Sequence, residues 1–226
     1  MQRTLEGVPC IARARSAVAA GGRLVRSAPL ALSFAALLLA TTIALRHFVA
    51  NDDAVLRWAS SNIDNLATQP IRALVVSAAF LPDQLWLPVA AAIGVVLVPL
   101  ERRFGGLRTL LVVASGHVLA TLATEGGVAV GLALGVLPGR DASRLDVGIS
   151  YGLWAAASAA LVLLPRRRRI ALAAVGALAV LAPLALDPGM TTAGHALSFA
   201  IGLGWWPVLL RARRPESPDA GHIVPL

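Results

Sequence analysis

Apolar residues along this chain gather in long runs instead of alternating with polar residues. Six of these runs approach or reach the roughly 17–25 residues that a helix needs to cross a bilayer. They are 28–45, 84–100, 108–124, 147–164, 170–186 and 191–210. Each run predicts a transmembrane helix, so the pattern predicts an all-α, polytopic membrane protein with a six-helix bundle. A further apolar stretch, 126–137, is short and rich in glycine, and it either extends the third helix or forms a re-entrant loop.

Composition supports a membrane protein. The chain is 57% hydrophobic and 14% charged, whereas a soluble domain has roughly 45–50% apolar and about 25% charged residues. The single cysteine, Cys10, excludes an intrachain disulfide. No group of His, Cys and acidic residues has the spacing of metal ligands, and no glycine-rich phosphate loop occurs. We therefore expect no metal and no cofactor.

The arginines set the predicted orientation, because basic residues favour the cytoplasmic side of a membrane. The chain has no lysine, and most of its arginines fall on alternate loops, which places them on one side. These are Arg3, Arg13, Arg15, Arg23, Arg26, Arg102, Arg103, Arg108, Arg166, Arg167, Arg168, Arg169, Arg211, Arg213 and Arg214. Both termini are then cytoplasmic, and the protein is a multi-pass protein of the plasma or inner membrane. Topology thus explains the net charge of +8, and we expect no nucleic-acid partner.

The same pattern divides the chain into three parts. Residues 1–27 form a basic cytoplasmic segment, 28–210 form the membrane domain, and 211–226 form a disordered cytoplasmic tail. The first apolar run is too long for a typical signal peptide and lacks a clear cleavage site, so we interpret it as an uncleaved anchor. Within the membrane domain, the outer loop 47–83 has an amphipathic character that favours the membrane surface.

Three polar residues stand out inside the apolar runs: His117, Ser150 and His195. At 1.5 Å per helical residue, they lie about 10, 5 and 6 Å from the outer ends of their helices. A serine hydroxyl becomes a nucleophile when a neighbouring base takes its proton, and a neutral imidazole is the usual base. Ser150 and His195 therefore predict acyl-transfer chemistry, provided that their helices pack closely.

Small residues around this pair permit such packing. Gly148 and Gly152 flank the serine, while Ser198 and Gly202 follow His195 on nearly the same helical face. Another possible class is a small transporter or channel. In that class His117 and His195 would lie along a proton or solute path. It would require polar groups that continue into the inner half of the membrane, and the sequence has none there except Ser158.

Three segments resemble the rhomboid family of intramembrane serine proteases. The segment 100–111, LERRFGGLRTLL, is similar to the family's Glu-x-Arg-x-Gly turn, with Glu101, Arg103 and Gly105. The segments GISYGLWA, 148–155, and GHALSFAIG, 194–202, resemble its serine and histidine motifs. The resemblance implies that Ser150 is the nucleophile, that His195 is the base, and that Trp154 lies beside them. Its expected substrates are single-span membrane proteins, cut near the outer face.

The chain departs from the family pattern at several positions. Tyr151 replaces the second glycine of the serine motif, and Ser198 replaces the first glycine after the histidine. Active members carry a His and an Asn in the second span to bind the oxyanion, but the matching positions here are about Leu85 and Val89. Two alternatives follow. Either another donor serves, such as the Ser150 amide with His117, with support from Gly148; or the protein is an inactive relative that binds transmembrane clients.

Overall fold

The computed structural model describes residues 26–81 and 86–212, which are helical without any strand. The predictions for Cys10, for Leu85, for the arginines before Arg26 and for the tail from residue 213 lie outside this range. The longer helices are α2 (Pro29–Phe48), α8 (Gly106–Ala133), α9 (Ser150–Ala160), α10 (Arg166–Leu186) and α11 (Met190–Gly204). The shorter ones are α3 (Asp52–Ala59), α4 (Ile63–Thr68), α5 (Pro70–Ser77), α6 (Trp86–Ala92), η2 (Ile93–Leu97), α7 (Val98–Phe104), η3 (Gly139–Ser143), η4 (Leu161–Leu163) and α12 (Trp206–Arg211).

Four helical segments of the described chain are long and apolar enough to cross a membrane. They are α2, α8, α10 and the combined run of α11 and α12. The two remaining predicted runs are helical as well: α6, η2 and α7 follow one another without a break, and α9 continues into η4. Each apolar run of the sequence therefore contains helix, and the chain is a helical membrane protein.

The third predicted helix is longer than its apolar run suggested. α8 continues to Ala133, so the stretch 126–137 extends this helix through most of its length and does not form a re-entrant loop. Glu125, which directly follows the third apolar run, consequently lies within α8 and is 1% exposed.

A π-helical turn, η2, separates α6 from α7. The N–H of Val98 bonds to the carbonyl of Ile93, five residues earlier. The next residue, Pro99, has no N–H and cannot bond to the carbonyl of Val95, four residues before it. The wider turn lets the helix continue through this interruption, as a single π-helical turn inside a longer helix.

Among the described helices, α8, α9 and α11 pack against one another most extensively. Glycines allow this approach: a β-carbon at Gly116 would lie 2.2 Å from that of Ala155, and one at Gly202 would lie 2.0 Å from the Ala155 carbonyl oxygen. Ser158 supports the same contact, since its Oγ donates to the Phe199 carbonyl at 2.8 Å. Gly202 thus lies where α11 approaches the backbone of α9.

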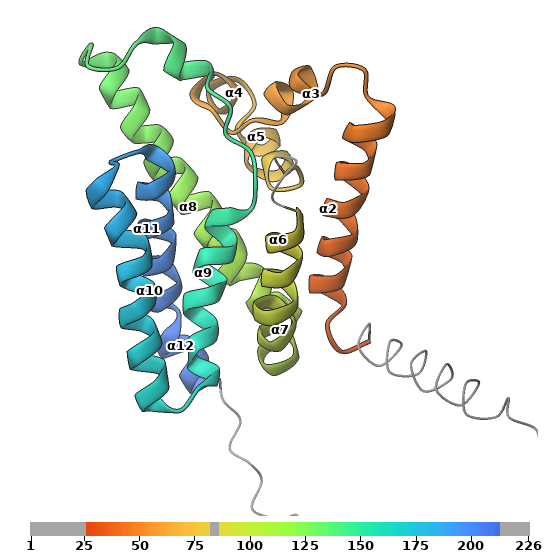
Figure 1. Cartoon of the computed structure of the whole chain (residues 1–226), viewed down its shortest axis with the longest axis vertical. Coiled ribbons are helices and arrows are strands. Elements are labelled where there is room, and N and C mark those ends of the chain that lie inside the picture. The colour runs from red at the N-terminus through yellow and green to blue at the C-terminus, as the bar shows by residue number, and fades with distance from the viewer. Residues whose placement is uncertain (1–25, 82–85, 213–226) are drawn as a thin grey trace, which may run out of the picture.

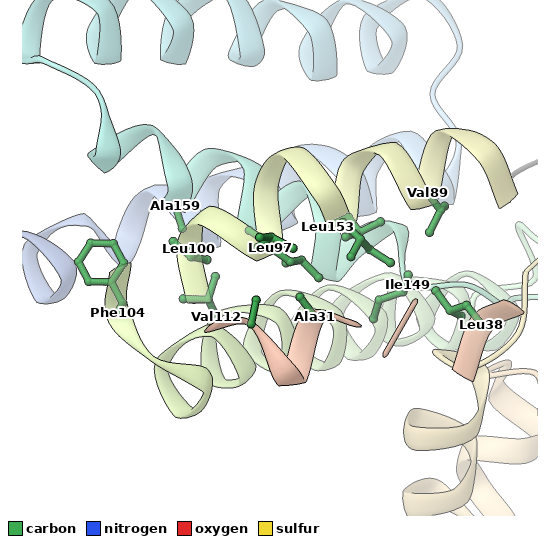
Figure 2. Close-up of a cluster of buried hydrophobic side chains, with 14 of the residues drawn as sticks. Ala31, Leu38, Val89, Leu97, Leu100, Phe104, Val112, Ile149, Leu153 and Ala159 are labelled. Atoms are coloured by element: carbon green, nitrogen blue, oxygen red, sulfur yellow. The ribbon is translucent and has the colours of Figure 1, made fainter. Parts of the chain in front are cut away.

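An apolar core joins these helices to the N-terminal part of the chain. Figure 2 shows Val89, Leu97 and Leu100 of the α6–α7 run between side chains of α2, such as Leu38, and side chains of α9, such as Leu153. Polar contacts secure α2 at one end. The Glu101 carboxylate accepts hydrogen bonds from the N–H groups of Leu30 (2.9 Å) and Ala31 (2.7 Å).

The helix ends sort into two groups (Figure 1). The α7–α8 turn, the start of α10 and α12 lie together at the lower end of the bundle, and these are the segments that carry Arg102, Arg103, Arg108, Arg166–Arg169 and Arg211. The short helices α3, α4 and α5 lie at the opposite end. They lie between residues 52 and 77 of the long loop; α4 and α5 pack against α8, and α4 also packs against η3.

Candidate active site

Ser150 and His195 lie within hydrogen-bond distance although 45 positions separate them in the sequence. The His195 Nε2 atom is 3.1 Å from the Ser150 Oγ atom. Ser150 is the first residue of α9, and His195 lies in the second turn of α11. The sequence analysis estimates similar depths for these two residues. Because α9 and α11 pack closely, their side chains meet.

Aromatic rings enclose the imidazole of His195. The Tyr151 ring meets it edge to face with a centroid distance of 5.6 Å, and the Trp154 ring lies 5.8 Å away at 45°. Trp154 also contacts the Phe199 ring. Trp154 and Tyr151 therefore both lie against His195.

The start of α9 provides hydrogen-bond donors near Ser150. The first N–H groups of a helix have no partner within the helix, and they carry partial positive charge. No side chain caps this end of α9. The chain enters α9 through Gly148, whose φ of +122° is a conformation that favours glycine, and the Gly148 N–H bonds to the Ser77 carbonyl at 2.9 Å.

Residues 144–149 form a segment without helix or strand, here called the strap, that leads directly into Ser150. Buried side chains of the long loop hold it. Asn62 Nδ2 donates to the Arg144 carbonyl at 3.1 Å, the Asp146 N–H donates to Ser60 Oγ at 2.9 Å, and Ser61 Oγ donates to the Asp146 carboxylate at 3.0 Å. The loop 47–83 thus fixes the backbone that positions the serine.

An ion pair anchors the strap from its other side. The Arg144 guanidinium donates to the carboxylate of Glu125, which is buried in α8. Neither residue was proposed for the site from the sequence. The position of Glu125 beside an apolar run was a possible signal for a buried charge. Its partner, Arg144, follows nineteen residues later, beyond a loop whose course the sequence pattern does not predict.

Two cavities meet at the serine–histidine pair, and Ser150 and His195 line both. One, of about 420 Å³, is apolar and includes Val89 and Ala92 of α6. The other, of about 260 Å³, is bounded by the strap, α8, α9 and α11 and includes His117, Thr121 and Asp146. Since Val89 carries no donor, α6 does not supply the hydrogen bond that the family pattern expects at this position.

His117 reaches the site from α8, but its ring is engaged elsewhere. Its Nε2 lies 2.9 Å from the Leu74 carbonyl and 3.4 Å from Ser77 Oγ. A carbonyl oxygen only accepts hydrogen bonds, so Nε2 carries the hydrogen and Nδ1 of the neutral ring is an acceptor. In this tautomer His117 has no free N–H for an oxyanion, and the role predicted for it requires another form.

The remaining predicted positions, Gly152 and Ser198, lie on α9 and α11. A β-carbon at Gly152 would lie 2.8 Å from Val113 Cγ1. Ser198 is buried, and its Oγ donates to the His195 carbonyl at 3.0 Å. Gly152 therefore lies at the contact between α9 and α8, whereas the hydrogen bond of Ser198 stays within α11.

These features define a helical membrane protein whose strap and tightly packed helices bring a serine and a histidine together. The model of the rhomboid-like protein family matches residues 23–216, and the chain belongs to that family. Comparisons with curated proteins and with solved structures give no match.

Proposed function

We propose that this protein is an intramembrane serine protease of the rhomboid-like family. The observation that carries the proposal is the 3.1 Å contact between His195 Nε2 and Ser150 Oγ at the junction of two cavities. A neutral imidazole at this distance is a suitable base for a serine nucleophile.

Acylation of the serine would proceed in two steps, and hydrolysis of the resulting ester by water would then release the second product and restore Ser150. Ser150 Oγ attacks the carbonyl carbon of the scissile peptide while its proton moves to His195 Nε2. The C–N bond then breaks, the leaving amine takes that proton, and an acyl-enzyme remains on Ser150. Donors preorganised around the developing oxyanion lower this barrier, and the N–H groups in the first turn of α9, which have no partner within the helix, would supply them.

The two cavities indicate a substrate class. The apolar cavity beside α6 suits the side chains of a membrane-spanning segment, and the more polar cavity under the strap suits the hydrated end of that segment. In the proposed topology the six helical segments each span the membrane and both termini are cytoplasmic, as the arginines predict. The expected substrates are single-span membrane proteins, cut on the side of α3–α5.

Binding of transmembrane clients without cleavage is the second candidate function. It is favoured by Val89, an apolar residue that lines the cavity where active relatives are expected to present a donor. Loss of one oxyanion donor lowers the rate by roughly 10²–10³-fold where it has been measured. A protein that retains the pair without sufficient oxyanion stabilisation would bind clients in the same apolar cavity.

Covalent labelling with a fluorophosphonate separates the two functions, because the probe reacts with activated serines. The purified protein in detergent is compared with Ser150→Ala and His195→Ala. Matched controls are Ser33→Ala and His47→Ala, which change the same residue types at exposed positions. Labelling of the wild type and both controls, with loss in the two site variants, would support the protease.

The opposite result is equally informative. A rhomboid protease that the probe labels serves as the positive control. If the control is labelled and the folded wild type is not, Ser150 is not activated and the protease proposal fails. Client binding is then measured directly, by cross-linking single-span membrane proteins to a photoreactive group placed at Val89.

A further inference from the structure

Asp146 brings an acidic side chain to the cavity under the strap. It lies four residues before Ser150, and both residues line the cavity of about 260 Å³ together with His195. Among the described residues around this cavity, Asp146 is the only aspartate, glutamate or arginine. The acylation step proposed above does not use it.

The Asp146 carboxylate has no ion-pair partner within residues 26–81 and 86–212. The arginine nearest to it along the strap, Arg144, pairs with Glu125 of α8 instead. Ser61 Oγ donates to Asp146 Oδ2 at 3.0 Å, and the other oxygen, Oδ1, remains to accept from a ligand. A carboxylate held in this way orients one oxygen while it keeps its charge.

The charges beside the strap favour a cationic ligand. A partly buried charge without a counter-charge is unfavourable, and charges attract each other more strongly in a site shielded from water than in bulk solvent. The single cation of this region, Arg144, already serves Glu125. An ammonium or guanidinium group that enters the cavity would therefore find an unneutralised carboxylate to which it can donate charge-assisted hydrogen bonds.

The size and position of the cavity indicate that this cation belongs to the substrate. A volume of about 260 Å³ is below the roughly 300–1,000 Å³ of pockets for drug-sized molecules, and it suits a single long side chain. The apolar cavity beside α6 would hold the membrane-spanning part of the substrate. The cavity under the strap would then receive a side chain from the hydrated end, next to the bond that Ser150 attacks.

We propose that Asp146 selects substrates that carry a lysine or arginine beside the scissile bond, on its hydrated side. The inference rests on the proposed protease function. The basic side chain would donate to Asp146 Oδ1 and so hold the peptide at Ser150. Basic residues gather in cytoplasmic loops of membrane proteins, so a basic residue at the outer end of a span is uncommon. It would distinguish substrates from most other single-span proteins.

Synthetic single-span peptides with a fluorophore and a quencher on opposite sides of the cleavage region test this selection in detergent. The cleavage site of a parent peptide is first mapped by mass spectrometry. Each of the three positions on its hydrated side then carries lysine, norleucine or glutamate, where norleucine has nearly the shape of lysine without its charge. At one position we expect the wild type to cut the lysine peptide with a kcat/KM on the order of 10–100-fold above that for norleucine, and glutamate to be cut most slowly.

Variants at Asp146 test whether this carboxylate is the cause. Asp146→Asn removes the charge at nearly constant volume and retains an oxygen for Ser61, so the lysine and norleucine peptides should be cut at similar rates. Labelling by the fluorophosphonate, which has no basic side chain, should fall far less than cleavage of the lysine peptide. Asp146→Glu retains the charge and should keep part of the preference. Asp64→Asn, which neutralises an exposed acidic residue of α4, is the matched control and should keep all of it.

Three results would overturn the inference. The first is a labelled wild type that cuts the lysine peptides no faster than their norleucine counterparts, or cuts neither. The second is an Asp146→Asn variant that keeps the full preference for lysine. The third is an equal loss in this variant of labelling and of cleavage of every peptide, which would assign Asp146 to holding the strap alone. Failure of the wild type to label would instead refute the protease function on which the inference rests.

Discussion

The ring of Tyr151 occupies the space that a side chain at position 194 would fill. A β-carbon on Gly194 would lie 2.2 Å from Tyr151 Cζ and 2.4 Å from its Oη. Tyr151 stands where the serine motif of the family has glycine, and Gly194 lies opposite it on α11. The glycine before His195 thus accommodates the bulky residue after Ser150, and α9 and α11 still approach closely enough for their pair to meet.

This fit predicts that Gly194→Ala is destabilising. Overpacking a well-packed site destabilises the folded state by about 1–3 kcal/mol. Displacement of the Tyr151 ring would also move the adjacent His195. We expect a lower melting temperature in detergent and weaker fluorophosphonate labelling. Gly204→Ala is the matched control on α11, because a β-carbon there has no neighbour within 4 Å.

Adding Tyr151→Ala tests the cause. In the double variant the new methyl group enters space that the ring has left. The double variant should therefore lose less stability than the two single variants together, with a coupling free energy of about 1–3 kcal/mol. Strict additivity would show that Gly194 matters for a reason other than this contact.

Much of the fold could be predicted from the sequence, because bilayer thickness determines the length of an apolar run. The position of Ser150 and His195 along their apolar runs also predicts that the two residues lie at a similar depth. The Tyr151–Gly194 fit and the strap could not be predicted, because they depend on contacts between segments far apart in the chain. Ser60–Asn62 is an ordinary polar loop sequence, and only the fold shows that it holds residues 144–146.

Glu101 predicts a second stability effect, at the end of the bundle away from the serine. Its two carboxylate oxygens accept the N–H groups of Leu30 and Ala31 in the first turn of α2, where negative charge is also favoured by the helix dipole. Glu101→Gln preserves the shape but turns an amide NH₂ toward one of these donors. Hydrogen bonds to charged groups contribute about 1.5–3 kcal/mol each, so we expect a loss of about 2 kcal/mol or more.

Unfolding by SDS in mixed micelles, followed by tryptophan fluorescence, measures this loss. Asp64→Asn is the control, since it neutralises an acidic residue at an exposed position. Equal midpoints for the two variants would contradict a role for Glu101 in holding α2.

The Glu125–Arg144 ion pair gives the third prediction, which links the strap to the site. Arg144→Gln leaves the carboxylate of Glu125 buried without its cation, and breaking a buried pair in this way costs about 3–5 kcal/mol. The strap leads from Arg144 to Ser150, so loosening it should also reduce labelling of the serine. Arg140→Gln, at an exposed position in η3, should change neither quantity.

Removing both charges distinguishes charge burial from a specific need for arginine. In Glu125→Gln with Arg144→Gln no uncompensated charge remains, and two amides can hydrogen-bond in place of the ion pair. The double variant should regain most of the stability that Arg144→Gln alone loses, since replacing both members of a buried pair is often close to neutral. Labelling should recover with stability if the pair acts by holding the strap. Recovery of stability without recovery of labelling would instead mean that Arg144 acts on the site through its charge.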